Sequence, residues 1–241
     1  MFPSRTRNVR LPPTARAHPR GRTAADFLLI RGMREEPGSH HGIAELAGRQ
    51  YGVISAGQMV ALGLSKDQIS REVSIGRLHR VHRGVYAVGH GALSRHGECF
   101  AAVLGCGGGA LLSHRSAAWL WGLTTRWRPV IEVTAASPVE TRCAIEVHSA
   151  SALKREDRAT FERVPVTAIP RTLLDFAAVD PKFLGAAIER AYRRDLLDLD
   201  AINRLLIRSK GFRGVARLRG RSRSTASRPS PARASSAASS L

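Results

Sequence analysis

Residues 55–88 read SAGQMVALGLSKDQISREVSIGRLHRVHRGVYAV, and this stretch decides how the first half of the chain is interpreted. Ser55 and Ser65 each precede a short helical pattern that ends at a glycine. Ser65 is followed three residues later by Gln68, which is the spacing of a capping box. Two short helices joined by a tight turn are typical of a helix-turn-helix.

The helix that begins after Ser65 carries the candidate recognition surface. Ile69 and Val73 lie four residues apart and mark the face that is expected to be buried. Lys, Gln, Ser and Arg side chains can bind phosphates and base edges in a major groove, whereas Asp67 either accepts from cytosine or favours the helix N-terminus. The residues expected to contact DNA from this helix are Lys66, Gln68, Ser70, Arg71 and Ser74.

A basic hairpin is predicted directly after this helix. Short β-prone runs flank Arg83 and Gly84, a pair that favours a tight turn. The pattern Ile43, Leu46 and Ala47 predicts a further helix upstream. Helices followed by a basic hairpin have the order of a winged helix, whose wing contacts the backbone or the minor groove. The wing residues expected to contact DNA are Arg77, Arg80, His82 and Arg83. The alternative is a small helical core with a solvated basic hairpin.

The charge of the chain is concentrated at its two ends. The formal net charge is +19, of which residues 1–33 carry +6 and residues 208–241 carry +9, leaving +4 for residues 34–207. Basic flanks attract phosphate without selecting a sequence, and do not choose between DNA and RNA. The case for DNA binding therefore rests on the middle of the chain.

Composition points to a cytoplasmic protein. No run of about 18 apolar residues predicts a transmembrane helix. The longest apolar stretch near the N-terminus, residues 27–30, is too short for a signal peptide. The three cysteines, Cys99, Cys106 and Cys143, form no CxxC pair and fit a reducing compartment.

The sequence divides into four segments of an α+β protein. Residues 1–40 are predicted to be a disordered basic segment, with Met33 as an alternative start. Residues 41–90 are predicted to be a winged helix-turn-helix domain, and residues 91–211 a small mixed α/β domain. Residues 212–241 consist almost only of Arg, Ser, Ala and Pro and are predicted to be a disordered tail.

Within residues 91–211, periodicity predicts strands at 130–134 and 144–148. Helices are predicted at 98–104, from Ser113, from Pro170, at 181–192 and at 199–206. Three tryptophans, Trp119, Trp121 and Trp127, are expected to pack in the core or against a partner.

The chain resembles the AbiEi-type antitoxins of abortive-infection (type IV) toxin–antitoxin systems. The resemblance covers about residues 41–215. It implies a winged-helix head that represses its own operon, an α/β second domain, and a nucleotidyltransferase-like toxin as partner. Carried over by position, it implies DNA contacts from Lys66, Gln68, Arg71, Arg77, Arg80 and Arg83. The segments that carry it are GRLHRVHRGVYAVGH (76–90), LSHRSAAWLWGL (112–123), IEVHSA (145–150) and VPVTAIPRTLLDFAAV (164–179).

The C-terminus departs from many relatives of this layout, which continue into a nuclease-like domain similar to very-short-patch-repair endonucleases. Here no Asp or Glu follows Asp200, and residues 220–241 read GRSRSTASRPSPARASSAASSL, a composition typical of a truncated or frameshifted gene. The alternative to an antitoxin-type regulator is therefore a DNA-targeting remnant without its nuclease. A third hypothesis is an adaptor that neutralises a toxin by contact.

No enzyme activity, metal site or cofactor is predicted. The glycines at 105–109 lack the Lys and Ser/Thr of a P-loop. Ser113 is expected to cap a helix, because Ser113 and His114 are sequence neighbours that point in different directions. Two hairpin histidines, His79 and His82, are not followed by a Cys/His quartet. Three scattered carboxylates, Glu132, Glu146 and Asp175, are expected on solvated faces, although two of them on paired strands could form an acidic site.

Overall fold

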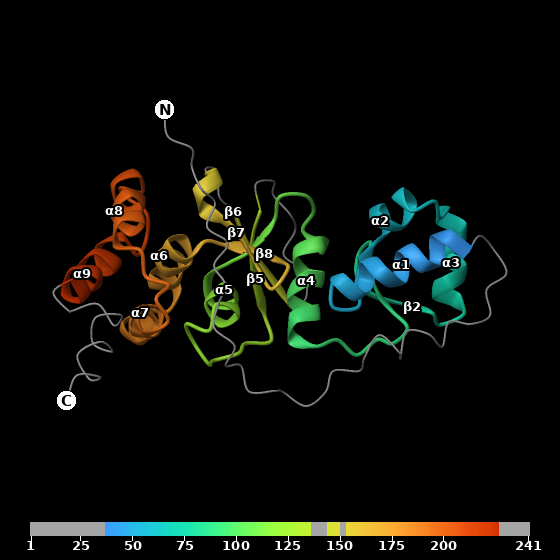
Figure 1. Ribbon diagram of the computed structural model, residues 1–241, viewed down its shortest axis with the longest axis horizontal. Coiled ribbons are helices and arrows are strands. Elements are labelled where there is room, and N and C mark those ends of the chain that lie inside the picture. Colours follow the sequence, from blue (N-terminus) through green and yellow to red (C-terminus); the bar gives the residue numbers. More distant parts are fainter. Residues whose placement is uncertain (1–36, 136–143, 150–152, 227–241) are drawn as a thin grey trace, which may run out of the picture. The chain divides into compact units, whose positions relative to one another are not determined.

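The computed structural model describes residues 37–135, 144–149 and 153–226 (Figure 1). The chain separates into two units, residues 1–34 and residues 35–241, and the described residues belong to the second unit. Most of the predicted disordered N-terminal segment, the alternative start at Met33, Cys143 and the end of the predicted tail lie outside the described residues.

The first region, which we call the head, combines helices with a small antiparallel sheet. The sheet has the order β1-β3-β2. Its elements follow one another as helix, strand, two helices and hairpin, an order that fits a winged helix. The bounds are α1 (Pro37–Arg49), β1 (Val53–Ser55), α2 (Ala56–Ala61), α3 (Lys66–Ser74), β2 (Leu78–His82) and β3 (Val85–Val88).

Local signals explain where the head's helices begin and end. Ser55 and Ser65 both form complete capping boxes, so each serine accepts from a backbone amide and the following glutamine reaches back. Gly63 adopts a φ of +97°, which permits the sharp turn between α2 and α3. Met59 on α2, Ile69 on α3 and Ile54 on β1 are all buried.

The second region, which we call the body, begins with α4 and contains a mixed sheet. Among the described residues the strand order is β6-β5-β4-β8-β7, with β5 parallel to β6 and β4 parallel to β8. Figure 1 shows α4 and α5 on opposite faces of this sheet. The bounds are α4 (Arg95–Gly105), β4 (Leu111–Leu112), α5 (His114–Leu120), β5 (Ile131–Ala135), β6 (Ile145–Ser149), β7 (Arg158–Phe161) and β8 (Val164–Thr167).

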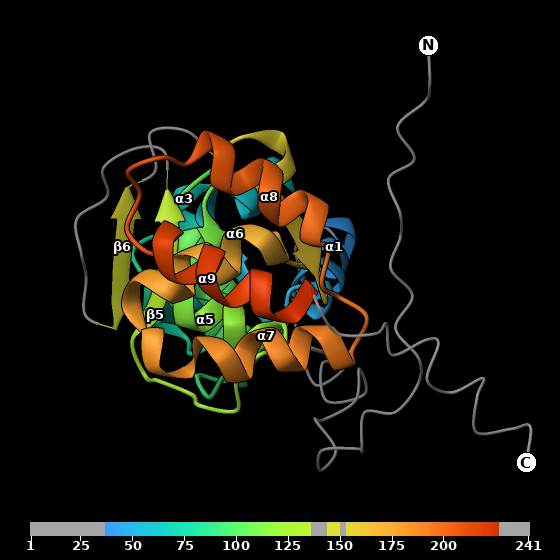
Figure 2. The ribbon, with the colours of Figure 1, turned by 90° about the vertical axis from the view of Figure 1, so that its left-hand side faces the viewer.

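Helices from the C-terminal part of the chain pack beside α5 (Figure 2). Gly214 lets α9 approach α6 closely, since a Cβ at this position would lie 2.7 Å from the Leu174 carbonyl oxygen. The bounds are α6 (Ile169–Val179), α7 (Leu184–Arg193), α8 (Leu199–Arg208) and α9 (Val215–Ala226), with 3-10 turns at Arg155–Asp157 and Pro181–Phe183. Within the described ranges, no helix is both long and apolar enough to cross a membrane.

The predicted α+β class is confirmed, but the C-terminal prediction differs from the structure. Residues 215–226 form α9 where a disordered tail was expected. Val215 and Leu218 are buried, because their spacing of three places both on one helix face. These two side chains supply buried apolar surface for α9, which the Arg- and Ser-rich composition did not indicate.

Two expectations about polar residues in the body are wrong. Glu132 and Asp175 are buried, at 2% and 6% exposure, although solvated faces were expected for them. Ser113 precedes α5 at the N-cap position, yet its hydroxyl makes no cap hydrogen bond and instead lies 2.9 Å from Nδ1 of His114. Glu132 is buried because α5 packs on the sheet, where Arg115 of that helix binds it.

The aromatic and cysteine residues described here lie in or against the core. Trp121 is buried and donates its indole N–H to the Thr167 carbonyl at 2.9 Å. Trp119 and Trp127 form an edge-on pair with ring centroids 4.6 Å apart. Cys99 and Cys106 are buried free thiols, and burial raises the Cys99 pKa to about 12.

Candidate nucleic-acid interface

Helix α3 is fixed to the head by one buried face and one polar cap. Ile69 is 4% exposed and anchors the buried face. At the N-terminus, Ser65 Oγ accepts from the Gln68 amide at 3.2 Å, while the Ser65 amide donates to Gln68 Oε1 at 2.7 Å. These contacts fix which side chains of α3 can face outward.

Most of the residues predicted to contact DNA are solvent-accessible. The two exceptions are half-buried: Arg77, which follows α3, and His82, at the end of β2. The exposed ones lie on α3 and on the hairpin, and are Lys66, Gln68, Ser70, Arg71, Ser74, Arg80 and Arg83.

Several polar groups of α3 already have partners within the helix. The Ser70 hydroxyl donates to the Lys66 carbonyl at 3.0 Å, and the Ser74 hydroxyl donates to the Arg71 carbonyl at 2.7 Å. Gln68 Oε1 is used in the capping box. Lys66 and Arg71 are the cationic side chains of this helix, and a cation attracts phosphate more strongly than a neutral hydroxyl or amide does.

The hairpin presents two arginines from a well-defined scaffold. Gly84 adopts a φ of +72° in the turn after Arg83. The Arg80 guanidinium lies 5.7 Å from the centre of the Tyr86 ring, which is buried on β3. A register shift between Arg80 and His82 changes the pairing of β2 near its end. This arrangement holds Arg80 against the sheet while leaving it exposed.

Two side chains that were predicted to contact DNA from the hairpin have protein neighbours that were not expected. A Cβ at Gly105 in α4 would lie 3.3 Å from the His82 Cβ, so His82 lies against α4 rather than along the outer edge of the hairpin. The Arg77 guanidinium lies 3.7 Å from the Glu72 carboxylate. The His82 contact could not be predicted from local sequence, because it depends on the position of α4.

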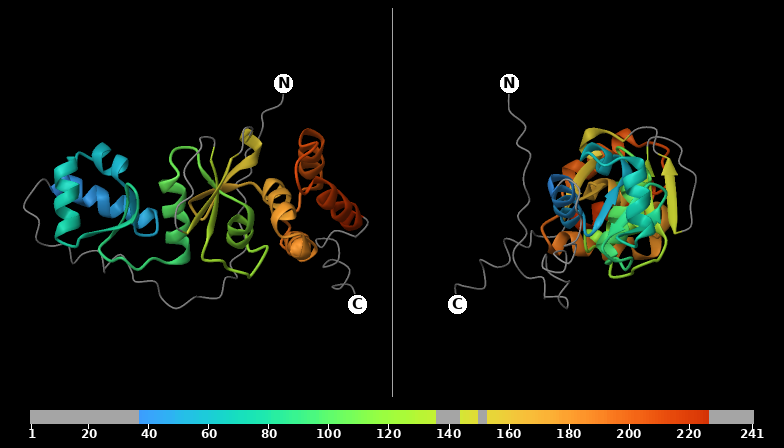
Figure 3. Two further views of the ribbon diagram at one scale, coloured as in Figure 1. Left: turned by 180° about the vertical axis from the view of Figure 1, so that it is seen from behind. Right: turned by 90° about the vertical axis from the view of Figure 1, so that its right-hand side faces the viewer.

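The head is joined to the body by contacts that sequence reasoning missed. The Tyr51 hydroxyl donates to the Glu162 carbonyl at 2.6 Å, and His96 Nε2 lies 2.9 Å from the Glu162 carboxylate. The Tyr51 and His96 rings stack with centroids 5.3 Å apart. Burial, followed by the charge of Glu162, raises the Tyr51 pKa. Figure 3 shows α4 between the head and the sheet of the body.

The comparisons with known proteins bear on the head. Residues 43–89 match the family described as "Transcriptional regulator, AbiEi antitoxin". The AbiEi resemblance predicted from the sequence is thereby confirmed over this segment, which runs from α1 through the hairpin. A search of curated proteins found no significant match. The AbiEi match thus covers the elements that carry the exposed face of α3 and the exposed hairpin arginines Arg80 and Arg83.

Proposed function

We propose that the chain is an AbiEi-type transcriptional regulator whose head binds double-stranded DNA. In this proposal α3 enters the major groove, where Lys66 and Arg71 contact phosphates or base edges, and the hairpin places Arg80 and Arg83 on the adjacent backbone. The observation that carries the proposal is the exposed basic face of α3 and the hairpin within a segment that matches this regulator family.

The local charge balance of the head supports this role. Residues 60–90 contain five Lys or Arg and two acidic residues, Asp67 and Glu72. Glu72 is half-buried beside Arg77, so it offsets that arginine more than the exposed ones. Lys66, Arg71, Arg80 and Arg83 are all exposed, and each contact between such a cation and a phosphate releases counterions and favours binding at low salt.

A titration of the full chain with DNA tests the proposal. The measurement compares the affinity for the promoter of its own gene with that for a scrambled duplex of equal length. Promoter binding about tenfold tighter corresponds to roughly 1.4 kcal/mol of sequence preference. Equal affinity for both duplexes would contradict a sequence-specific regulator and would favour the alternative, a DNA-targeting remnant of a nuclease fusion.

A matched pair of variants separates the head from the basic remainder of the chain. Arg71→Ala and Arg193→Ala each remove one exposed arginine from a helix, the first in the head and the second in α7. Arg71→Ala is expected to weaken promoter binding and to reduce the salt slope by about 0.9 if it removes one phosphate contact. Equal effects of the two variants would place binding outside the head.

The antitoxin description also leads us to propose a protein partner. The partner in this proposal is a nucleotidyltransferase-like toxin encoded beside the regulator. Co-expression of the two genes tests it, and rescue of growth by this chain is the expected result. Rescue that persists in the Arg71→Ala variant would show that toxin control does not require DNA binding. Absence of rescue at matched expression would contradict the antitoxin role.

A further inference from the structure

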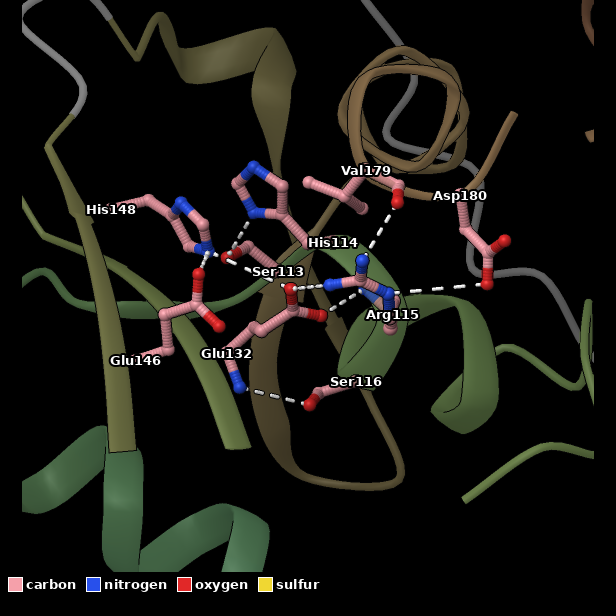
Figure 4. Close-up of polar contacts among 9 residues, drawn as sticks. All are labelled: Ser113, His114, Arg115, Ser116, Glu132, Glu146, His148, Val179 and Asp180. Atoms are coloured by element: carbon pink, nitrogen blue, oxygen red, sulfur yellow. Dashed lines mark hydrogen bonds and ion pairs between the residues drawn. The ribbon is translucent and has the colours of Figure 1, made fainter. Parts of the chain in front are cut away.

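Two neighbouring strands of the body carry polar side chains at the same level of the sheet. In the parallel pair of β5 and β6, Glu132 lies opposite Glu146 and Thr134 lies opposite His148. Alternate residues of a strand point to the same face, so these four share one face. It is the face toward α5, because Arg115 of that helix bonds to Glu132 (Figure 4).

The distances among three of these side chains are those of ligands around one ion. His148 Nε2 lies 3.7 Å from Glu132 Oε1 and 3.7 Å from Glu146 Oε1, and the three ligand atoms lie within 4.8 Å of one another. A separation of 3.7 Å is too long for a hydrogen bond. Two ligands placed about 2.1 Å from one metal at a tetrahedral angle lie about 3.4 Å apart.

The first carboxylate is held in place by α5. The Arg115 amide donates to Glu132 Oε2 at 2.6 Å, and its guanidinium donates to Glu132 Oε1 at 2.6 Å. Arg115 is itself fixed by a hydrogen bond to the Val179 carbonyl at 2.7 Å. On the other side, the Glu132 amide donates to the Ser116 hydroxyl at 2.9 Å. A carboxylate oriented in this way resembles ligands that are supported by a second layer of contacts.

The imidazole is held in place by a second histidine. The rings of His114 and His148 stack with centroids 3.6 Å apart, and His114 Nδ1 lies 2.9 Å from Ser113 Oγ. Figure 4 shows the His148 ring presenting Nε2 toward the two carboxylates.

Two buried polar atoms at the cluster make no hydrogen bond within the described part of the chain. His148 Nε2 is inaccessible to solvent and makes none. The Thr134 hydroxyl, on a residue 1% exposed and opposite His148 in the sheet, also makes none. Because a buried polar group without a hydrogen bond is costly, the two together point to a missing polar occupant.

We propose that Glu132, Glu146 and His148 bind a divalent transition-metal ion, with Zn²⁺ the best match to one imidazole and two carboxylates. The two carboxylates outnumber the single Arg115 guanidinium, so the site attracts a cation. Three protein ligands leave a coordination position for water, as in open zinc sites. The ordered water around such an ion supplies hydrogen bonds for neighbouring buried groups such as Thr134.

Metal binding by the full chain tests the proposal directly. The chain is stripped with a chelator, titrated with Zn²⁺ by calorimetry, and its metal content is measured by mass spectrometry after dialysis. Glu146→Gln and His148→Ala are each expected to lose one bound equivalent relative to the unmodified chain. Glu146 is half-exposed, so its isosteric replacement by Gln preserves the fold.

The chain offers a matched control in a second histidine–glutamate pair. His96 and Glu162 lie 2.9 Å apart away from the cluster, and Glu162→Gln is expected to keep the full number of zinc equivalents. Circular dichroism of each variant confirms that it is folded. Retention of every equivalent in both Glu146→Gln and His148→Ala would overturn the proposal, as would an unmodified chain that binds no zinc. Neither result depends on DNA binding by the head.

Discussion

The head and the body place their polar residues in opposite ways. In the head, most charged side chains of α3 and the hairpin face solvent, and Ser55 and Ser65 cap backbone amides close by in sequence. In the body, Arg115 of α5 pairs with the buried Glu132 of β5, and Arg171 pairs with the buried Asp175 within α6. Polar residues in the head are thus available to a partner, whereas those in the body depend on one another.

The largest expected loss of stability tests whether the buried polar groups of the body depend on one another. Arg115→Ala removes the guanidinium that pairs with Glu132 at 2.6 Å and leaves a buried carboxylate without its main cation. Breaking one side of a buried ion pair is expected to lower the free energy of unfolding by about 3–5 kcal/mol, measured by urea denaturation. Arg193→Ala breaks an exposed pair with Glu189 and is expected to cost less than about 1 kcal/mol. Similar losses in the two variants would remove this contrast.

A pH series sharpens the same contrast through Asp175. Burial raises the Asp175 pKa from 3.8 to about 6, although Arg171 acts in the opposite direction. Between these values the folded chain holds a proton that the unfolded chain releases. The free energy of unfolding therefore falls as pH rises from about 4 to about 6, by at most about 3 kcal/mol from this group.

Asp175→Asn removes that pH dependence. Relative to the variant, the unmodified chain is expected to lose stability progressively between pH 4 and pH 6, measured by urea denaturation at each pH. The variant also loses the ion pair with Arg171, which lowers its stability at every pH at which that pair is formed. The informative quantity is therefore how the difference in free energy of unfolding between the two chains changes with pH. If the difference in free energy of unfolding between the two chains stayed constant from pH 4 to pH 7, the pKa of Asp175 would not be raised.

A smaller effect is expected from a helix cap in the head. Ser65→Ala removes the hydroxyl that accepts from the Gln68 amide and is expected to lower the free energy of unfolding by about 1 kcal/mol. Ser74→Ala is a control in the same helix, because Ser74 bonds only to a carbonyl in its own turn. Equal losses would mean that the Ser65 hydroxyl contributes no specific capping.

The smallest effect on stability is expected where the effect on DNA binding is proposed to be large. Arg71 is exposed on α3, so Arg71→Ala is expected to change the free energy of unfolding by no more than about 0.5 kcal/mol. Thermal unfolding monitored by circular dichroism measures it. A loss of more than about 2 kcal/mol would show that Arg71 supports the head itself, and any loss of DNA binding would then follow from unfolding.

Much of the head could be predicted because its signals are local. The Ser65 capping box, the N-cap at Ser55 and the hairpin turn at Arg83 and Gly84 occur where the sequence predicted them. Strand β1 was missed because three residues are too few to show an alternating pattern. The position of His82 against α4 was missed because α4 begins more than ten residues later in the chain.

The body was predicted less completely because its site depends on strand register. The repeated Ile-Glu-Val at 131–133 and 145–147 was the available signal, since two such strands paired in parallel place Glu132 beside Glu146. The sequence did not specify that pairing. It also did not show that β4, with two residues, separates β5 from β8 in the sheet.

The sequence by itself determined the elements whose causes lie within a few residues. These are the caps, the turns, the apolar face of α3 and the exposed cations beside it, because hydrogen bonds between near neighbours and helical periodicity are set by spacing alone. Only the tertiary structure decided which polar groups of the body meet. Burial of Glu132 and the stacking of His114 on His148 require α5 to pack on the β5–β6 pair, and that packing joins residues more than 15 positions apart.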